Sequence, residues 1–191
     1  MNSLRIIAGT FGGRKLKSVD GLTTRPTADK IKEAVFSSIG NDIYDANILD
    51  VFSGTGSIAL EAISRGAKSA VLIEQNKAAQ KVIFENIRLC GAEEQCTLLK
   101  GDSFQILKQL GNQNKKFHII YLDPPYKEGF YESILNMIQE YSLLEKDGLL
   151  ITESEKNTSI LPQNSLFCIH KEKYYGISKI TYLKWNQTQE V

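Results

Sequence analysis

The stretch ILDVFSGTGSIALEAISRGA, residues 48–67, decides the fold. Its first residues, Ile48–Phe52, are mostly apolar and predict a buried strand. Gly54 and Gly56 follow, and glycine permits both a tight turn and a close approach of the backbone to a ligand. An apolar helical pattern then covers Ser57–Arg65. A strand, a glycine turn and a helix in this order indicate an open α/β sheet, in which ligands bind at the carboxyl ends of the strands.

The same alternation continues along the chain. Further strands are predicted over Ala70–Glu74, Cys96–Lys100, Phe117–Leu122 and Leu149–Thr152, and further helices over Lys77–Leu89, Ser103–Leu110 and Gly129–Tyr141. Continuously apolar strands separated by helices predict a parallel sheet covered on both faces. The tail LFCIHKEKYYGISKITYLKW predicts an antiparallel edge hairpin that turns at Tyr175-Gly176. We therefore expect a doubly wound, mostly parallel, seven-stranded Rossmann-like sheet.

The first 40 residues differ in charge from the rest of the chain. They hold seven Lys and Arg against three acids, whereas the whole chain has a net charge of only +1. LRIIAGTFGGRKLKSV predicts two short strands around Gly12-Gly13, and a helix is predicted from Pro26 to Gly40. We interpret residues 1–40 as a basic extension that faces a polyanion, and residues 41–191 as the α/β domain.

Composition narrows the class of protein further. A chain of 191 residues, 42% of them hydrophobic, fits one globular domain, and no apolar run is long enough to span a bilayer. The start lacks the features of a secretory signal. Cys90, Cys96 and Cys168 form no CxxC pair, which argues for a reducing compartment and against a zinc site. We expect a cytoplasmic, metal-free protein that is a monomer.

Two cofactors compete for the glycine turn. Residues 54–59, GTGSIA, satisfy the dinucleotide fingerprint, and Glu74 follows where a ribose-binding acid belongs, so a nicotinamide cofactor is one candidate. Asp50 favours the other candidate, S-adenosylmethionine, because a carboxylate repels a pyrophosphate but attracts the ammonium of a methionine moiety. Glu74 is then the acceptor for the ribose hydroxyls, and Asp102 either accepts from the adenine amino group or caps the next helix. We assign the cofactor to Asp50, Phe52, Gly54, Gly56, Glu74 and Asp102.

The strand over Phe117–Leu122 ends in Asp123-Pro124-Pro125-Tyr126. A planar amino group or amide is a poor nucleophile, and two acceptors can fix its two hydrogens and aim its lone pair at a methyl group. The Asp123 carboxylate and the Pro124 carbonyl are the predicted acceptors, and Tyr126 offers a face on which a planar substrate stacks. Direct methyl transfer of this kind depends on positioning and electrostatics rather than on a strong base. Asp123, Pro124 and Tyr126 are the predicted catalytic residues.

DVFSGTG followed by DPPY resembles the class I methyltransferases that modify planar nitrogen. With RIIAGTFGGRKL, TRPTADKIKEAVF, ILDVFSGTGSIALEAISRGA and IIYLDPPY, nearly the whole chain is similar to the RsmD-type ribosomal RNA methyltransferases. That resemblance implies methylation of the exocyclic 2-amino group of one guanine in 16S ribosomal RNA, either as free RNA or within a small-subunit particle. It also implies that Arg5, Arg14 and the Arg25-Pro26-Thr27 segment belong to an RNA-facing arm. The basic charge of the same extension adds Lys15 and Lys17 as predicted phosphate contacts, so the predicted RNA-facing residues are Arg5, Arg14, Lys15, Lys17, Arg25 and Thr27.

Other functions stay open at this stage. A DNA adenine amino group or a protein glutamine amide is also a planar nitrogen, although the basic extension disfavours glutamine. A nicotinamide oxidoreductase would need an acid or base for hydride transfer, and the sequence offers no obvious one. A non-catalytic nucleic-acid-binding module is the remaining alternative. The sequence does not specify which guanine is modified.

Overall fold

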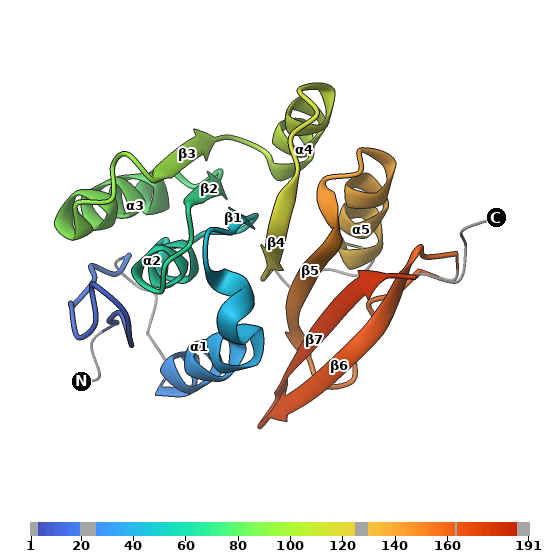
Figure 1. The fold of residues 1–191 in the computed structure, drawn as a ribbon, viewed down its shortest axis with the longest axis horizontal. Helices are drawn as coiled ribbons and strands as arrows, with labels where there is room; N and C mark the ends of the chain where they lie inside the picture. Colours follow the sequence, from blue (N-terminus) through green and yellow to red (C-terminus); the bar gives the residue numbers. More distant parts are fainter. Residues whose placement is uncertain (1–3, 20–25, 125–129, 163, 187–191) are drawn as a thin grey trace. The chain divides into compact units, whose positions relative to one another are not determined.

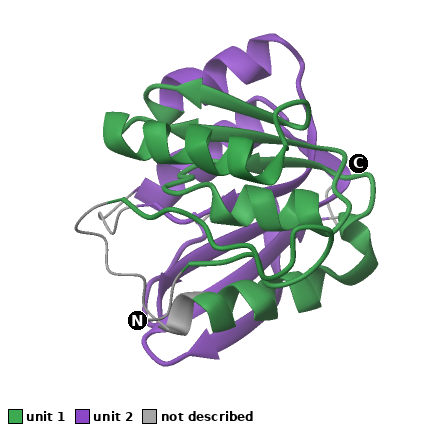
Figure 2. Ribbon diagram, turned by 90° about the vertical axis from the view of Figure 1, so that its left-hand side faces the viewer, with its two compact units in different colours: residues 1–103 green, residues 104–191 purple. Residues whose placement is uncertain are grey.

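A computed structural model describes residues 4–19, 26–124, 130–162 and 164–186, with the side chains of residues 26–28 outside the description. The chain divides into two compact units, residues 1–103 and 104–191, which Figure 2 shows in green and purple. The predicted boundary at residue 40 separates a basic, RNA-facing extension from the α/β domain, and it does not refer to compact units. It stays a prediction.

The first unit contains a parallel three-stranded arrangement in the order β3-β2-β1 (Figure 1). Its elements are α1 (Pro26–Ile39), the 3-10 helix η1 (Gly40–Ile43), β1 (Asn47–Asp50), α2 (Ser57–Ser64), β2 (Ser69–Glu74), α3 (Lys77–Cys90) and β3 (Cys96–Lys100). Leu49, Leu60, Leu72 and Ile83 are completely buried. Strands and helices alternate because a glycine or a helix cap after each apolar strand turns the chain into the next helix.

The second unit contains four strands in the order β4-β5-β7-β6. Its elements are α4 (Ser103–Asn112, whose first residue ends the first unit), β4 (Phe117–Leu122), α5 (Phe130–Glu140), β5 (Leu144–Glu155), β6 (Phe167–Tyr175) and β7 (Ser178–Trp185). β4 and β5 are parallel, whereas β7 is antiparallel to both β5 and β6. The seven described strands are those of a mostly parallel Rossmann-like sheet with a C-terminal antiparallel hairpin, which confirms the predicted fold class.

Three local predictions differ from the structure. The first strand ends at Asp50 rather than Phe52, because Val51 and Phe52 already belong to the glycine turn. β5 is longer than predicted, because its start pairs with β4 ahead of a register shift between Phe117 and Ile119. The N-terminal segment forms one antiparallel bridge, Arg5 to Lys15, instead of two longer strands, because the N–H groups of Ile7 and Ala8 donate to the Glu61 side chain on α2 rather than to a partner strand.

Candidate cofactor and substrate site

The glycine turn between β1 and α2 needs both of its glycines. Gly54 has a φ of +55° and Gly56 a φ of +76°, conformations that side chains rarely adopt. A Cβ on Gly56 would also lie 3.1 Å from a methyl group of Leu72. Gly56 directly precedes α2, so the turn presents the N-terminal end of that helix at the carboxyl end of β1. This is the location predicted for the cofactor.

Asp50 ends β1 as a buried carboxyl group that is only 2% exposed. Burial raises the pKa of Asp50 to about 7, and the charge of Glu74 adds to the rise, whereas the backbone N–H of Ala59 opposes it. Its Oδ2 atom has no hydrogen-bond partner among the described residues. A cationic group bound there would supply a donor and favour the ionised carboxylate. An ammonium therefore fits this position, and a pyrophosphate does not.

Glu74 ends β2 and holds the glycine turn in place. One carboxylate oxygen accepts from the N–H of Gly54 at 2.9 Å, and the other accepts from the N–H of Asn76 at 2.7 Å. Each oxygen has a second lone pair, so the carboxylate can still accept from ribose hydroxyls. The sequence predicted only the contact with ribose. The structure adds a second task, which is to fix the position of Gly54.

Asp102 follows β3 and directly precedes α4. Glu74 is paired with Lys100 on the neighbouring strand β3, and the backbone carbonyl of Glu74 accepts from the N–H of Gly101 at 3.1 Å. Asp50, Glu74 and Asp102 therefore follow three neighbouring strands at the same edge of the sheet. Asp102 also occupies the position of a helix cap, so both of its predicted roles remain compatible with its place. Phe52 lies half-buried in the glycine turn.

Asp123 and Pro124 follow β4 in the second unit, where Asp123 is exposed and Pro124 is buried. Tyr126, the third predicted catalytic residue, lies outside the described residues. Glu153, near the carboxyl end of the neighbouring β5, is a polar group that the sequence analysis did not select. Its Oε2 accepts from the Tyr121 hydroxyl at 3.1 Å, and burial raises the pKa of Glu153. The catalytic roles of Asp123 and Pro124 stay predictions.

Buried Asn86 on α3 connects the N-terminal segment to the glycine turn. Its amide NH₂ donates to the carbonyls of Thr55 (2.9 Å) and Lys17 (3.0 Å), and its carbonyl accepts from the N–H of Lys17 (2.8 Å). The side chain is completely buried. These three bonds use both donors and the acceptor, and through them the Asn86 side chain bridges a predicted RNA-facing segment and the predicted cofactor turn. Sequence reasoning missed Asn86, because only its position on the buried face of α3 distinguishes it.

Glu61 fastens the N-terminal segment, residues 4–19, to α2. The carboxylate is completely buried and has four partners: the N–H groups of Ile7 (2.7 Å) and Ala8 (3.1 Å), Arg65 Nε (2.7 Å) and Lys32 Nζ (3.5 Å). An acid within the apolar pattern IALEAIS was the signal that could have identified this role. The N-terminal segment is therefore not a loose arm, because buried bonds hold its backbone.

Ser64 and Gly9 complete this attachment. The Ser64 hydroxyl donates to the carbonyl of Ala8 at 2.5 Å and accepts from the N–H of Phe11 at 2.9 Å. Gly9 has a φ of +83°, and a Cβ there would lie only 1.8 Å from the Ser64 carbonyl oxygen. The segment can approach α2 this closely only because residue 9 is glycine.

The predicted RNA-facing residues that the structure describes, Arg5, Arg14, Lys15 and Lys17, are all exposed. Arg5 lies 3.7 Å from Asp29, and Lys17 lies 2.9 Å from Glu85. Arg14 donates to the Leu89 carbonyl at 2.8 Å. Arg25 and the side chain of Thr27 lie outside the described residues. Exposed pairs of this kind are weak, so the cations can exchange their partners for phosphates.

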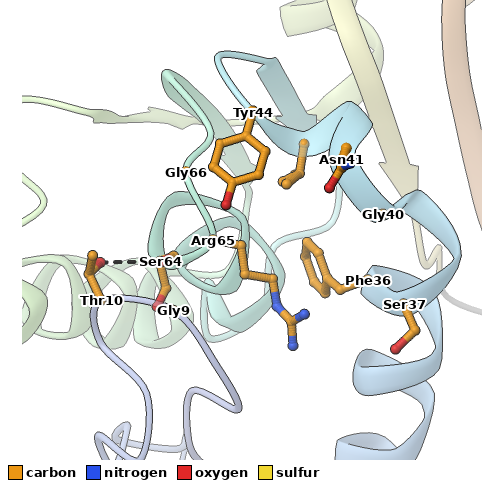
Figure 3. Close-up of a pocket in the computed structure, with 11 residues that line it drawn as sticks. Gly9, Thr10, Phe36, Ser37, Gly40, Asn41, Tyr44, Ser64, Arg65 and Gly66 are labelled. Atoms are coloured by element: carbon orange, nitrogen blue, oxygen red, sulfur yellow. Dashed lines mark hydrogen bonds between the residues drawn. The ribbon is translucent and has the colours of Figure 1, made fainter.

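A pocket of about 740 Å³ lies at the end of α2 opposite the glycine turn (Figure 3). Its walls come from the N-terminal segment, α1, η1 with the residue after it, and the end of α2 with the two residues after it: Gly9, Thr10, Phe36, Ser37, Gly40, Asn41, Ile43, Tyr44, Ser64, Arg65 and Gly66. The Arg65 guanidinium lies 5.1 Å from the centre of the Phe36 ring. This pocket is separate from the three acids and is not the predicted cofactor site.

Within the described part of the chain, no group of three His, Cys, Asp or Glu side chains is arranged to hold a metal ion. Among the same residues, no helix is both long and apolar enough to cross a membrane.

The mostly parallel sheet with its C-terminal antiparallel hairpin is that of an α/β protein of the Rossmann-like methyltransferase class. The chain belongs to the family described as "Conserved hypothetical protein 95", whose model matches residues 4–184. "Ribosomal RNA small subunit methyltransferase D" of Escherichia coli K12 is 32% identical, with 91% of this chain and 85% of that protein aligned. The protein of the same name in Haemophilus influenzae is 34% identical over 91% and 90% of the two chains. These relatives confirm the resemblance on which the functional expectation rests.

The fold agrees over the same length. The solved structure of the Escherichia coli protein yhhF has a TM-score of 0.86 and 31% identity, and the match covers 97% of this chain and 99% of that one. Because nearly all of both chains is aligned, the hairpin and the N-terminal segment are part of the shared fold.

Proposed function

We propose that this protein transfers a methyl group from S-adenosylmethionine to the exocyclic 2-amino group of a guanine in 16S ribosomal RNA. Similarity to small-subunit ribosomal RNA methyltransferases over 91% of this chain supports the substrate class. The buried Asp50 carboxyl, with its unpartnered oxygen at the glycine turn, is the observation that carries the choice of cofactor.

Each strand-end acid has a distinct task in this proposal. Asp50 binds the ammonium of the methionine moiety, Glu74 accepts from the ribose hydroxyls, and Asp102 accepts from the adenine amino group. Gly54 and Gly56 allow the backbone to approach the cofactor closely. When bound, S-adenosylmethionine supplies a methyl group activated by its positively charged sulfur.

The substrate is held by residues that follow β4. The Asp123 carboxylate and the Pro124 carbonyl accept the two hydrogens of the guanine amino group and aim its lone pair at the methyl carbon. The nitrogen becomes positively charged as the new bond forms, and Asp123 stabilises that charge before the nitrogen loses a proton. Tyr126 stacks on the base, which must first leave its own stack in the RNA. An enzyme with this substrate would act in the cytoplasm on 16S RNA or on a small-subunit particle.

Mapping methylated nucleotides in 16S RNA tests this function. RNA from cells that lack the protein is expected to lose one N2-methylguanine, and a plasmid copy should restore it. An unchanged 16S methylation pattern would contradict the proposal. A methyl group missing from DNA adenine or from a protein glutamine would assign the enzyme to another planar nitrogen.

A further inference from the structure

The outward face of α3 has a basic and aromatic stripe, which consists of Lys77, Lys81, Phe84 and Arg88. These residues follow the spacing i, i+4, i+7, i+11, which places them along one side of a helix. All four are exposed, whereas the opposite side of α3 is buried in the first unit. The stripe is about 16 Å long, at about 1.5 Å per residue.

Phe84 is the unusual member of this stripe. It is 55% exposed, and the guanidinium of Arg88 lies 5.9 Å from the centre of its ring. Leu89, one residue further, is 44% exposed. An exposed aromatic ring next to cations offers a flat surface for a base and charges for the adjacent phosphates, which is how proteins bind single-stranded nucleic acid.

The charge of this face also suits a polyanion. Glu85 is the one acid in the sequence of α3, and it already pairs with Lys17 at 2.9 Å. At its far end the stripe meets the N-terminal segment, because Arg14 donates to the Leu89 carbonyl at 2.8 Å. Arg14 itself lies 5.4 Å from the ring centre of Phe11, which forms a second pair of a guanidinium and an aromatic ring.

The near end of the stripe adjoins the cofactor edge of the first unit. Lys77 begins α3 directly after Asn76, and the N–H of Asn76 donates to the Glu74 carboxylate at 2.7 Å. A strand of RNA on this face would therefore extend from the cofactor edge toward the basic N-terminal segment.

We propose that the α3 stripe binds a single-stranded segment of the RNA substrate, with a base stacked on Phe84 and phosphates on Lys81 and Arg88. This inference rests on the proposed function, since it takes RNA as the substrate. The α3 stripe contains none of the strand-end acids and none of the residues that the sequence motifs selected for RNA binding.

Fluorescence anisotropy with a labelled, unstructured oligoribonucleotide tests the stacking contact. Phe84→Leu keeps an apolar side chain but removes the aromatic face, and Phe84→Tyr keeps the face. We expect Phe84→Leu to weaken binding about tenfold and Phe84→Tyr to bind like wild type. Equal binding by Phe84→Leu and wild type would overturn the proposal, and would instead indicate a site for an apolar partner or plain solvent exposure.

The salt dependence of the same binding tests the phosphate contacts. Lys81→Gln/Arg88→Gln should reduce the slope of log K against log salt by about 1.4, since each contact on a single strand contributes about 0.7. Lys171→Gln/Lys173→Gln on β6 is the matched control and should leave the slope unchanged. An unchanged slope in the α3 variant, or an equal loss in the control, would overturn the proposal.

Two further measurements separate this inference from the proposed function. S-adenosylhomocysteine affinity should stay at the wild-type value in every α3 variant, which shows that the first unit remains folded. If wild type methylates 16S RNA while the α3 variants bind RNA normally, only the stripe proposal fails. If wild type methylates no RNA, the proposed function fails first.

Discussion

The side-chain amide of Asn86 donates a hydrogen bond to the carbonyl of Thr55, 2.9 Å away, in the middle of the glycine turn. The same side chain exchanges two bonds with the backbone of Lys17. One buried residue therefore holds both the predicted cofactor turn and the N-terminal segment.

Asn86→Asp should weaken cofactor binding as well as stability. The substituted carboxylate has nearly the same shape, but it places an acceptor against the carbonyls of Thr55 and Lys17 and leaves them without a donor. Each unsatisfied buried group costs about 1–3 kcal/mol. Calorimetry with S-adenosylhomocysteine measures the effect. Ser69→Ala, which removes a side-chain bond to Asn47 at the start of β2, is the control and should bind normally. Equal affinity in wild type and Asn86→Asp would mean that the turn keeps its geometry without Asn86.

Glu74→Gln should impair cofactor binding for a related reason. The carboxylate accepts from two backbone N–H groups, those of Gly54 and Asn76, and a glutamine side chain must turn its NH₂ toward one of them. We expect a loss of about 1–3 kcal/mol in S-adenosylhomocysteine affinity, measured by titration calorimetry. Glu93→Gln on the surface should have no effect. A wild-type affinity in Glu74→Gln would remove this acid from the cofactor site.

Asp50 should make the stability of the cofactor-free protein dependent on pH. Its folded pKa of about 7 lies above the ordinary value of 3.8, so the folded protein retains a proton that the unfolded chain has released. The resulting stabilisation is complete below pH 3.8 and is lost as the pH rises through 7. Between about pH 5 and pH 8, the free energy of unfolding of wild type should fall by about 3 kcal/mol relative to that of Asp50→Asn. Urea denaturation at the two pH values measures this difference, and parallel behaviour of the two proteins would show that Asp50 is already ionised.

The same carboxyl should control cofactor affinity. An ammonium binds the ionised form, so the affinity of wild type for S-adenosylhomocysteine should rise as the pH increases through about 7. Asp50→Asn should bind more weakly and show little dependence in that range. A pH-independent wild type would argue against contact between Asp50 and the ammonium.

Removing the charge of Glu61 should destabilise the first unit strongly. Lys32 is 3% exposed, and Glu61→Gln leaves its ammonium buried without this carboxylate. Breaking such a buried pair lowers the free energy of unfolding by about 3–5 kcal/mol. Glu85→Gln is the control: it breaks an exposed pair with Lys17 and should lower the free energy of unfolding by less than about 1 kcal/mol. Denaturant unfolding compares the two. Glu61→Gln/Lys32→Met should recover part of the loss, and similar costs for Glu61→Gln and Glu85→Gln would contradict the buried network.

The sequence predicted the parts of the fold that depend on local patterns. The apolar strands, the glycine turn and the hairpin at Tyr175-Gly176 all lie where periodicity and turn chemistry indicate. The N-terminal segment was predicted less well, because its conformation depends on Glu61 and Ser64, more than 50 residues away. A hydrogen bond over such a distance leaves no periodic signal.

In the candidate site, too, local sequence patterns predicted some features, whereas others depend on contacts between distant residues. The order of strands and acids in the sequence predicted that Asp50, Glu74 and Asp102 would share one sheet edge, and the structure confirms this. The bond between Glu74 and Gly54, and the three bonds of Asn86, depend on how β2 and α3 pack against the turn. Such contacts become visible only once the elements are placed in three dimensions.

Methyl transfer by Asp123→Ala tests the central claim most directly. Wild type and variant are compared in single turnovers on small ribosomal subunits from cells lacking the protein, with labelled S-adenosylmethionine and mass spectrometry of the product nucleoside. We expect N2-methylguanine from wild type. Asp123→Ala should lose about 3–4 kcal/mol of transition-state stabilisation, which is a rate loss of several hundredfold, while it still binds S-adenosylhomocysteine. Tyr126→Ala should lose less, about 1–3 kcal/mol, and Tyr126→Phe almost nothing. A near wild-type rate in folded, cofactor-binding Asp123→Ala would contradict the proposed active site.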